Sequence, residues 1–247
     1  DIDSFSYDSL SPGNPQNGYA TQTQESTSYA LFGSIDYAFS ETFSIKAGLR
    51  YSDDERDFAA DRPQPLFQPP LSAPITRSVS GDNVSGDLTA SFKTNENVTF
   101  FGRLATGYRA PSIQGRIMFA PDFADGQDPA TNGVSVADEE KITSFEVGAK
   151  TELARKLRLN VAGYLYQVDG QQIVAVGGRF NTATLLNADK TNGYGFEVDL
   201  DWAPSSDWLF TLGTSYNHTE IDDPALAGAT CGGGCTVTSP VVDGLAR

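Results

Sequence analysis

The sequence is short of histidine, cysteine and positive charge. Its 247 residues include one histidine, two cysteines and 17 lysines and arginines, against 32 aspartates and glutamates. The resulting net charge of −15 argues against a nucleic-acid-binding protein, because such a surface needs cations to neutralise phosphates. For the same reason the chain is not expected to dock on an anionic membrane surface.

Long apolar runs are missing too. No stretch of about 18 consecutive apolar residues occurs, so the sequence predicts no membrane-spanning helix, and its first residues do not resemble a secretory signal. Hydrophobic residues make up only 39% of the chain. This length is compatible with one large all-β domain or two smaller domains.

Patterns for catalysis and metal binding are also absent. His218 is expected after a strand end, at the margin of a loop and solvated, because a metal site needs several converging ligands. Asp122, Asp125 and Asp128 lack the spacing of a calcium loop. No nucleophile has a base at motif spacing, and no segment matches a nucleotide-binding loop. The sequence therefore predicts neither an enzyme nor a cofactor.

The two cysteines, Cys231 and Cys235, flank three glycines. A flexible loop of this length could close as a disulfide in an oxidising compartment. Two free thiols in the same loop are the alternative. A zinc site is not expected, since no histidine lies nearby.

What the chain does contain is a strict alternation of apolar and polar residues, clearest in residues 193–202, "GYGFEVDLDW". A strand sends successive side chains to opposite faces. This segment therefore has one apolar and one acidic face. Its apolar residues are Phe196, Val198, Leu200 and Trp202, and its acidic ones are Glu197, Asp199 and Asp201.

The alternation predicts eight strands, each long enough for the roughly 9–11 residues with which a tilted strand crosses a bilayer. They cover residues 29–39, 43–51, 83–92, 98–109, 141–153, 157–168, 193–202 and 208–217.

The predicted connections alternate between short turns and long loops, the latter over residues 52–80, 112–140 and 170–190. Short turns at one end and long loops at the other are typical of outer-membrane barrels. A soluble sandwich seldom sorts its loops by end in this way.

Aromatic residues gather beside the short turns, as an interfacial girdle would. They are Tyr37, Phe39, Phe43, Phe92, Trp202 and Trp208. The acidic face is expected to line a wet or salt-bridged lumen, because burying its carboxylates without partners would be costly. The cations expected beside them are Lys46, Arg50, Lys93, Arg103, Arg109 and Lys150. The predicted fold class is all-β, an antiparallel transmembrane β-barrel.

Four stretches in order, over roughly residues 25–220, resemble TonB-dependent outer-membrane receptors. The first is the strand–turn–strand segment that ends in Gly-Leu-Arg-Tyr at residues 48–51. The second is Gly-Tyr-Arg-Ala-Pro at residues 107–111. The others lie around residues 140–150, without the proline usual in the family, and around residues 187–197. The matching positions in those two are Glu140, Glu146, Gly148 and Lys150, then Asn187, Ala188, Gly195 and Glu197.

The resemblance implies a twenty-two-stranded barrel with an N-terminal plug in a Gram-negative outer membrane. Such a receptor imports a scarce nutrient, most often a ferric siderophore or other iron chelate, with energy delivered through TonB. Since no plug and no TonB-binding segment is recognisable, residues 1–247 are expected to be a partial barrel domain within a larger receptor. The expected partners are the lipid bilayer, an iron chelate and, through other parts of the receptor, TonB.

Substrate contacts are expected from the upper lumen and long loops, at Tyr108, Arg109, Gln114, Arg116 and Phe119. The guanidinium groups could bind an anionic chelate. Alternatively, Arg109 could pair with a lumen carboxylate such as Glu146, and Phe119 could pack the loop onto its neighbours.

Two other readings of the whole chain stay open. A self-contained eight-stranded barrel would have its interior filled by side chains and act as an anchor, adhesin or binder. A soluble β-sandwich would be a binding module, for example for carbohydrate.

Overall fold

The structure is a computed structural model that describes residues 5–7, 18–64, 74–115, 134–153, 156–177 and 182–226. These residues form strands and turns, and they include no helix long and apolar enough to cross a membrane.

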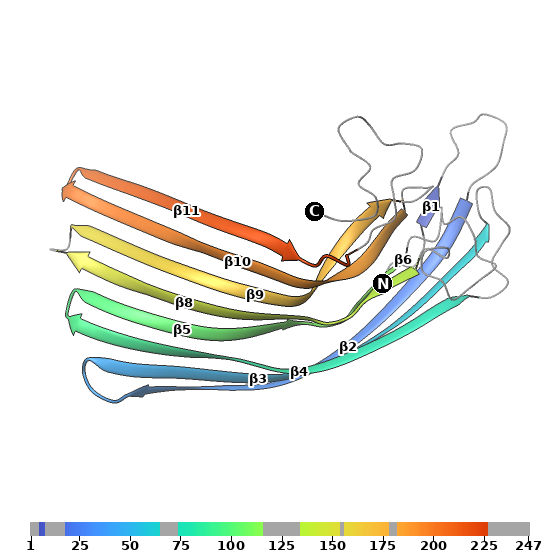
Figure 1. The fold of residues 1–247 in the computed structure, drawn as a ribbon, viewed down its shortest axis with the longest axis horizontal. Helices are drawn as coiled ribbons and strands as arrows, with labels where there is room; N and C mark the ends of the chain where they lie inside the picture. Colours follow the sequence, from blue (N-terminus) through green and yellow to red (C-terminus); the bar gives the residue numbers. More distant parts are fainter. Residues whose placement is uncertain are drawn as a thin grey trace.

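One antiparallel sheet contains nine strands in the order β1-β2-β3-β4-β5-β8-β9-β10-β11 (Figure 1). Their bounds are Phe5–Tyr7 (β1), Gly18–Ala38 (β2), Phe43–Gln64 (β3), Ile75–Asn95 (β4), Val98–Arg109 (β5), Glu140–Leu153 (β8), Leu157–Gly177 (β9), Thr182–Ser205 (β10) and Trp208–Asp222 (β11). A two-stranded sheet is formed by β6 (Ser112–Gly115) and β7 (Val134–Ala137). The large sheet is curved but open, with β1 and β11 at its two ends.

The predicted tight turns lie together at one end of the sheet, on the left of Figure 1. Their polar residues satisfy the backbone locally, as hairpin turns require. The hydroxyl of Ser40 accepts hydrogen bonds from the Thr42 and Phe43 amides at 3.2 and 3.0 Å. The side chain of Asn95 accepts one from the Asn97 amide at 2.9 Å.

The eight predicted strands are confirmed, but the long connections are shorter than predicted because the strands extend into them. Strand β3 continues to Gln64, β4 already begins at Ile75, and β9 and β10 occupy most of residues 170–190. His218 lies inside β11, and its predicted place at a loop margin is wrong. The extensions of β3 and β4 carry polar residues on both faces, and those of β9 and β10 carry apolar residues on both, such as Val174 and Leu185. The apolar–polar alternation by which strands are recognised is therefore lost there while backbone pairing continues.

The register aligns the apolar residues of neighbouring strands on one face, called here the apolar face. One row across the sheet contains Ile35, Ala47, Leu88, Leu104, Phe145, Leu165, Tyr194 and His218. The side chains of Trp202 and Leu212 stay 47% and 58% exposed. No second layer of the described polypeptide covers this face, which disfavours the β-sandwich.

The apolar face has a defined height. Along β9 it runs from Leu157 to Leu165, or ~27 Å at the usual rise per residue. For a strand tilt near 40° this is ~20 Å, comparable to the ~25 Å apolar band of outer-membrane barrels. Four residues further along β9, the paired positions of β8 to β11 on the same face are charged. They are Lys141, Asp169, Lys190 and Asp222.

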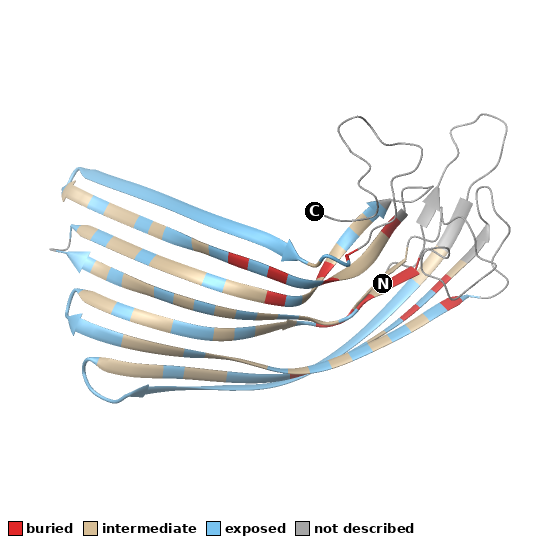
Figure 2. Cartoon of the chain, viewed as in Figure 1, coloured by how far each residue is buried: buried red, intermediate tan, exposed pale blue. Residues whose placement is uncertain are grey.

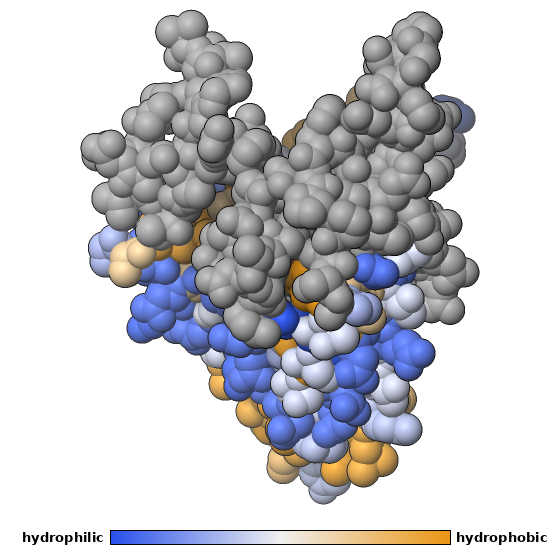
Figure 3. All heavy atoms as spheres, turned by 90° about the vertical axis from the view of Figure 1, so that its right-hand side faces the viewer, coloured by the Kyte–Doolittle hydropathy of each residue, from blue (hydrophilic) through white to orange (hydrophobic). Residues whose placement is uncertain are grey.

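Aromatic rings mark the end of this band beside the tight turns, as predicted. The rings of Tyr37 and Phe39 lie 4.7 Å apart, and Phe210 contacts both Trp202 and Trp208 at 5.5 and 5.9 Å. The opposite end, beyond the charged row, is called the mouth. Viewed from the mouth, the described surface is mostly hydrophilic, with hydrophobic atoms along its lower edge and in smaller patches above (Figure 3).

Candidate ligand-binding mouth

Strands β5 and β8 stop short of their neighbours at the mouth. After Arg109 the chain passes through the buried residues Ala110 and Pro111 into β6, and it returns from β7 through Asp138 and Glu139. Proline has no amide hydrogen, so Pro111 cannot continue the ladder of β5. The β6–β7 hairpin therefore sits between the extensions of β3–β4 and β9–β10 (Figure 1).

Gln172 of β9 holds both stems of this hairpin. Its side-chain Nε2 donates to the carbonyl oxygens of Ala110 at 2.9 Å and Asp138 at 2.8 Å. Its Oε1 accepts a hydrogen bond from the hydroxyl of Ser112 at 2.6 Å. The residue is only 8% exposed. One buried amide thus satisfies three groups from two distant segments.

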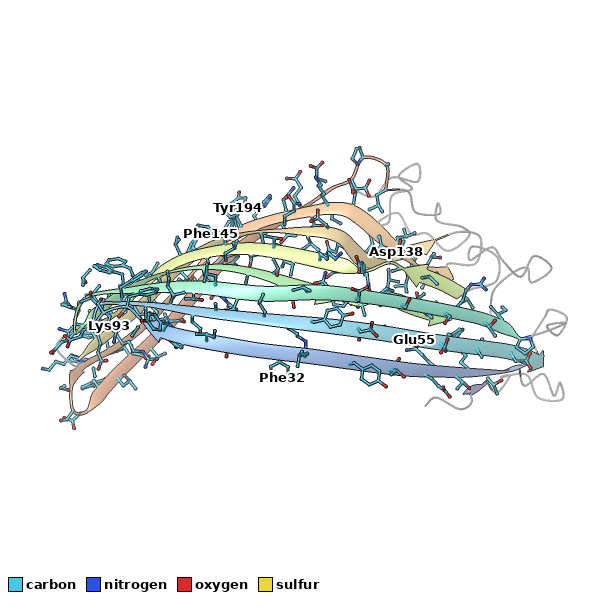
Figure 4. All side chains as sticks on the ribbon, turned by 90° about the horizontal axis from the view of Figure 1, so that it is seen from below. Phe32, Glu55, Lys93, Asp138, Phe145 and Tyr194 are labelled. Atoms are coloured by element: carbon cyan, nitrogen blue, oxygen red, sulfur yellow. The ribbon has the colours of Figure 1, made fainter. Side chains whose placement is uncertain are left out.

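Asn187, the cross-strand neighbour of Gln172 on β10, completes this anchor. Its Nδ2 donates to the carbonyls of Asp138 at 3.0 Å and Gly170 at 2.7 Å, and its Oδ1 accepts from the Asp138 amide at 2.7 Å. Asp138 lies toward the mouth end, far from Lys93 at the turn end (Figure 4). Nearby, the hydroxyl of Ser135 accepts from the Leu185 amide at 2.9 Å.

Arg109 is paired with a carboxylate, as one of the two sequence-based alternatives proposed, but the partner is not Glu146. Its Nη1 lies 3.8 Å from Oε2 of Glu140, and the same oxygen accepts a hydrogen bond from the backbone amide of Gln172 at 2.7 Å. Glu146 lies opposite Arg103, lower on the lumen wall.

The other side of the hairpin is apolar. Phe58, Ala60, Ile75 and Val134 form a buried cluster, with Ile113 packed against it. The described buried residues gather where the strands bend at the mouth, while the rest of the sheet is exposed or half-buried (Figure 2). The hairpin thus contacts β3–β4 through side-chain packing and β9–β10 through hydrogen bonds.

Tyr108 reaches over β4 at the mouth. A Cβ atom on Gly81 would lie 2.6 Å from its hydroxyl, so glycine is needed there for space. The hydroxyl is buried and has no hydrogen-bond partner among the described atoms. Burial, followed by the nearby carboxylates of Asp54, Glu139 and Asp82, raises the pKa of Tyr108 to about 12. It is therefore a protonated donor at physiological pH.

The other predicted contact residues divide into two groups. Gln114 lies in β6, and its buried Oε1 also has no partner within the described part of the chain. Arg116, Phe119, Cys231 and Cys235 lie outside the described residues, as do Asp122, Asp125 and Asp128. The structure thus brings Tyr108, Arg109 and Gln114 to the mouth, and the substrate contact expected of all five residues stays a prediction.

The polar face below the mouth carries charges of both signs, as predicted. A hollow of about 710 Å³ is lined by Lys46, Asp87, Arg103, Glu146, Lys150, Glu197 and Asp199, among others. Arg103 lies 3.9 Å from Asp87, and Arg158 lies 3.6 Å from Asp201. Two aromatic rings break the pattern: Phe32 lies beneath Arg50 and Phe101 beneath Lys150. Within the described ranges no three histidine, cysteine or acidic residues are placed to hold a metal ion.

Sequence reasoning missed Gln172 and Ser135, and it noted Asn187 only as part of a motif. In a strand, the sequence pattern does not distinguish a glutamine or asparagine whose side chain binds a remote backbone segment from one whose side chain faces water. The only available signal was indirect, namely that Asn187 and Glu140 stand at positions resembling those of one family.

Comparison with known proteins gives a consistent result. A family model described as "TonB dependent receptor-like, beta-barrel" matches residues 1–238. The fold is similar to the ferric yersiniabactin uptake receptor FyuA from Yersinia pestis, with 19% identity and a TM-score of 0.68 over 89% of this chain and 30% of that one.

Two further solved structures are similar. The siderophore receptor PiuA from Acinetobacter baumannii has 20% identity and a TM-score of 0.54, covering 92% of this chain and 28% of that one. The copper transporter OprC has 19% identity and a TM-score of 0.58, covering 83% and 29%. The chain thus spans less than one third of each structure, and at these identities the likeness concerns the fold.

Proposed function

Because the chain belongs to the TonB-dependent receptor β-barrel family, we propose that it forms part of the wall of an outer-membrane importer of a Gram-negative bacterium. The family consists of transporters and receptors, not enzymes. The longer barrel would be completed by strands that pair with β2 and β11. A plug domain and the contact with TonB belong to the proposed whole receptor, beyond residues 1–247.

The observation that carries this proposal is the two-faced sheet. Its apolar face matches the height of a bilayer and has no described layer over it, whereas its polar face is lined with ion pairs and a hollow. A curved wall with lipid on one side and water on the other serves passage of a polar solute. The open edges distinguish it from a closed eight-stranded barrel.

An iron chelate is the proposed cargo. One of the similar structures is named as a ferric yersiniabactin uptake receptor and another as a siderophore receptor, although OprC is named as a copper transporter. Within the described mouth, Tyr108 and Gln114 have polar atoms without a described partner, and because both atoms are buried a cargo would reach them only after the mouth rearranges. Arg109 and Lys141 are both paired with neighbouring carboxylates.

The charge of the mouth favours a neutral or cationic chelate over a polyanionic one. Its described residues carry fifteen carboxylates and five lysines or arginines. A potential of this sign attracts cations and repels anions before contact. The mouth residues that carry these charges lie within 21–30, 52–61, 74–83, 106–115, 134–143, 167–177, 182–192 and 219–226.

Uptake by a strain that lacks the full-length protein tests this function. Radiolabelled iron is supplied either as an anionic tris-catecholate chelate or as a neutral or cationic hydroxamate chelate. In a third assay, radiolabelled copper replaces iron. We expect uptake of the hydroxamate chelate to fall and to return on complementation with the wild-type gene. Unchanged uptake of every chelate would contradict the iron proposal, and a defect confined to copper would replace the cargo.

A further inference from the structure

We propose that Gln172 and Asn187 are positioning residues which make the β6–β7 hairpin part of the β9–β10 side of the mouth. The hairpin borders both sides of the mouth, but within the described part of the chain the side-chain hydrogen bonds that hold its stems come from β9–β10. When the mouth opens, the hairpin stays with β9–β10 and separates from β3–β4. This inference concerns how the wall moves and does not depend on the cargo.

The β9–β10 side holds the hairpin through directed bonds to its backbone. Gln172 and Asn187 together bind the carbonyl of Asp138 with two donors, at 2.8 and 3.0 Å. Both stems are included, because Gln172 also binds Ala110 at 2.9 Å. Breaking this anchor leaves the buried carbonyl of Ala110 unpaired, which is costly because no water replaces the lost donor there, whereas Asp138 is exposed and its carbonyl can turn to water.

The β3–β4 side makes a different kind of contact. Apolar packing of Phe58 and Ile75 against Val134 has no directional requirement. We call the contact between the hairpin and β3–β4 the seam. The Tyr108 hydroxyl and Gln114 Oε1, the two buried polar atoms without a partner among the described residues, belong to segments beside it. The hydroxyl of Tyr108 lies against Gly81 of β4. Gln114 belongs to β6, and the next residue, Gly115, faces the ring of Phe58 in β3. Opening the seam would let water reach these atoms, so separation there costs less than at the anchor.

Glu140 strengthens the same asymmetry. Its carboxylate accepts a hydrogen bond from the Gln172 amide and lies near Arg109, so the end of β5 is tied to β9 as well. The hairpin, its two stems and Arg109 therefore form one unit with β9–β10.

Hydrogen exchange of the purified full-length receptor, without ligand, tests the inference. The variant Gln172→Ala should speed exchange of the amides at 112–115 and 134–137 by tenfold or more. The variant Gln167→Ala is the matched control, because Gln167 lies on the same strand and its side-chain amide donates to Asp169. It should leave the hairpin unchanged. A third variant, Phe58→Ala, removes packing at the seam and should speed hairpin exchange less than threefold.

Two outcomes would overturn the proposal. One is Phe58→Ala releasing the hairpin as much as Gln172→Ala does. The other is Gln172→Ala leaving hairpin exchange at the wild-type rate.

A second substitution at position 172 separates loss of the anchor from general damage. Gln172→Glu keeps the shape of the side chain but replaces both Nε2 donors with an acceptor that faces the carbonyls of Ala110 and Asp138. Its hairpin should be released at pH 8 and partly re-protected at pH 5.5, after correction for intrinsic exchange, because a protonated carboxyl regains one donor. A release that does not depend on pH would contradict the role assigned to the donors. This variant also serves if Gln172→Ala fails to fold.

Discussion

At the scale of single residues, Gly170 is the described position whose backbone conformation most strongly requires glycine. Its φ of +66° lies in the left-handed region, and an added Cβ atom would lie 2.8 Å from the carbonyl oxygen of Glu139. The left-handed conformation of Gly170 within β9 brings its carbonyl to Asn187, next to the anchor of the hairpin.

Replacement of Gly170 by alanine should lower the free energy of unfolding by about 2 kcal/mol, from backbone strain and the contact with Glu139. Gly33→Ala is the control, because a Cβ there meets nothing within 4 Å. It should be neutral or stabilising by up to about 1 kcal/mol. Equilibrium unfolding in lipid or detergent measures both, and equal effects would contradict the geometry at Gly170.

The hydroxyl of Tyr108 gives a second prediction at this scale. Since it is buried without a described partner, Tyr108→Phe should leave stability at neutral pH unchanged or raise it by up to about 1 kcal/mol. If the hydroxyl contacts the cargo, the same variant should weaken uptake. A clear loss of stability would reveal a hydrogen bond that this account lacks.

The raised pKa of Tyr108 also sets a pH dependence. The phenol titrates near pH 10 when unfolded and at about 12 when folded. Between these values the folded state retains a proton that the unfolded state has lost, so stability falls as the pH rises. Tyr108→Phe should reduce this fall between pH 10 and 12, measured by unfolding at several pH values. An identical decline in both proteins would contradict the burial of the hydroxyl.

At the scale of strands, what the sequence predicted depended on which solvent each face meets. Within the apolar band, one face must be apolar, so Phe196, Val198 and Leu200 marked their strand and its orientation without a structure. Above the band both faces are wet. Residues such as Asp53 and Asp54 therefore give no period, although β3 continues through them. The anchor made by Gln172 was beyond prediction because it joins β9 to backbone groups some 34 and 62 residues away in sequence.

Paired arginine substitutions on β9 test the assignment of faces. Val161 lies midway along the apolar face, and Asn160 lies beside it on the polar face, lining the hollow with Asp199. Val161→Arg should destabilise the folded barrel by about 2–4 kcal/mol, the cost of a cation at the bilayer midplane. Asn160→Arg should cost under about 1 kcal/mol, since nearby carboxylates can pair with it. Unfolding in lipid vesicles measures both, and a larger penalty at position 160 would reverse the faces.

At the scale of the whole molecule, the open edges decide how the chain can exist. All 15 residues of strand β11 are exposed, and among the described strands it borders only β10. Such an edge inside a bilayer leaves backbone groups unpaired, which hydrocarbon does not tolerate. We therefore expect residues 1–247, expressed alone, to give no heat-modifiable, detergent-resistant barrel, whereas the full-length receptor does. A compact, stable monomer of the isolated chain would favour the self-contained small barrel.

The central claim is that lipid covers the apolar face and water covers the polar face. Nitroxide labels placed singly at positions 196–202 of the full-length receptor in bilayers test it directly. We expect the labels at 196, 198, 200 and 202 to collide mainly with oxygen, which concentrates in lipid. Those at 197, 199 and 201 should collide mainly with a water-soluble nickel chelate. Labels at 200 and 202 that are shielded from both reagents would mean that polypeptide covers this face, and the account of the wall would then be wrong.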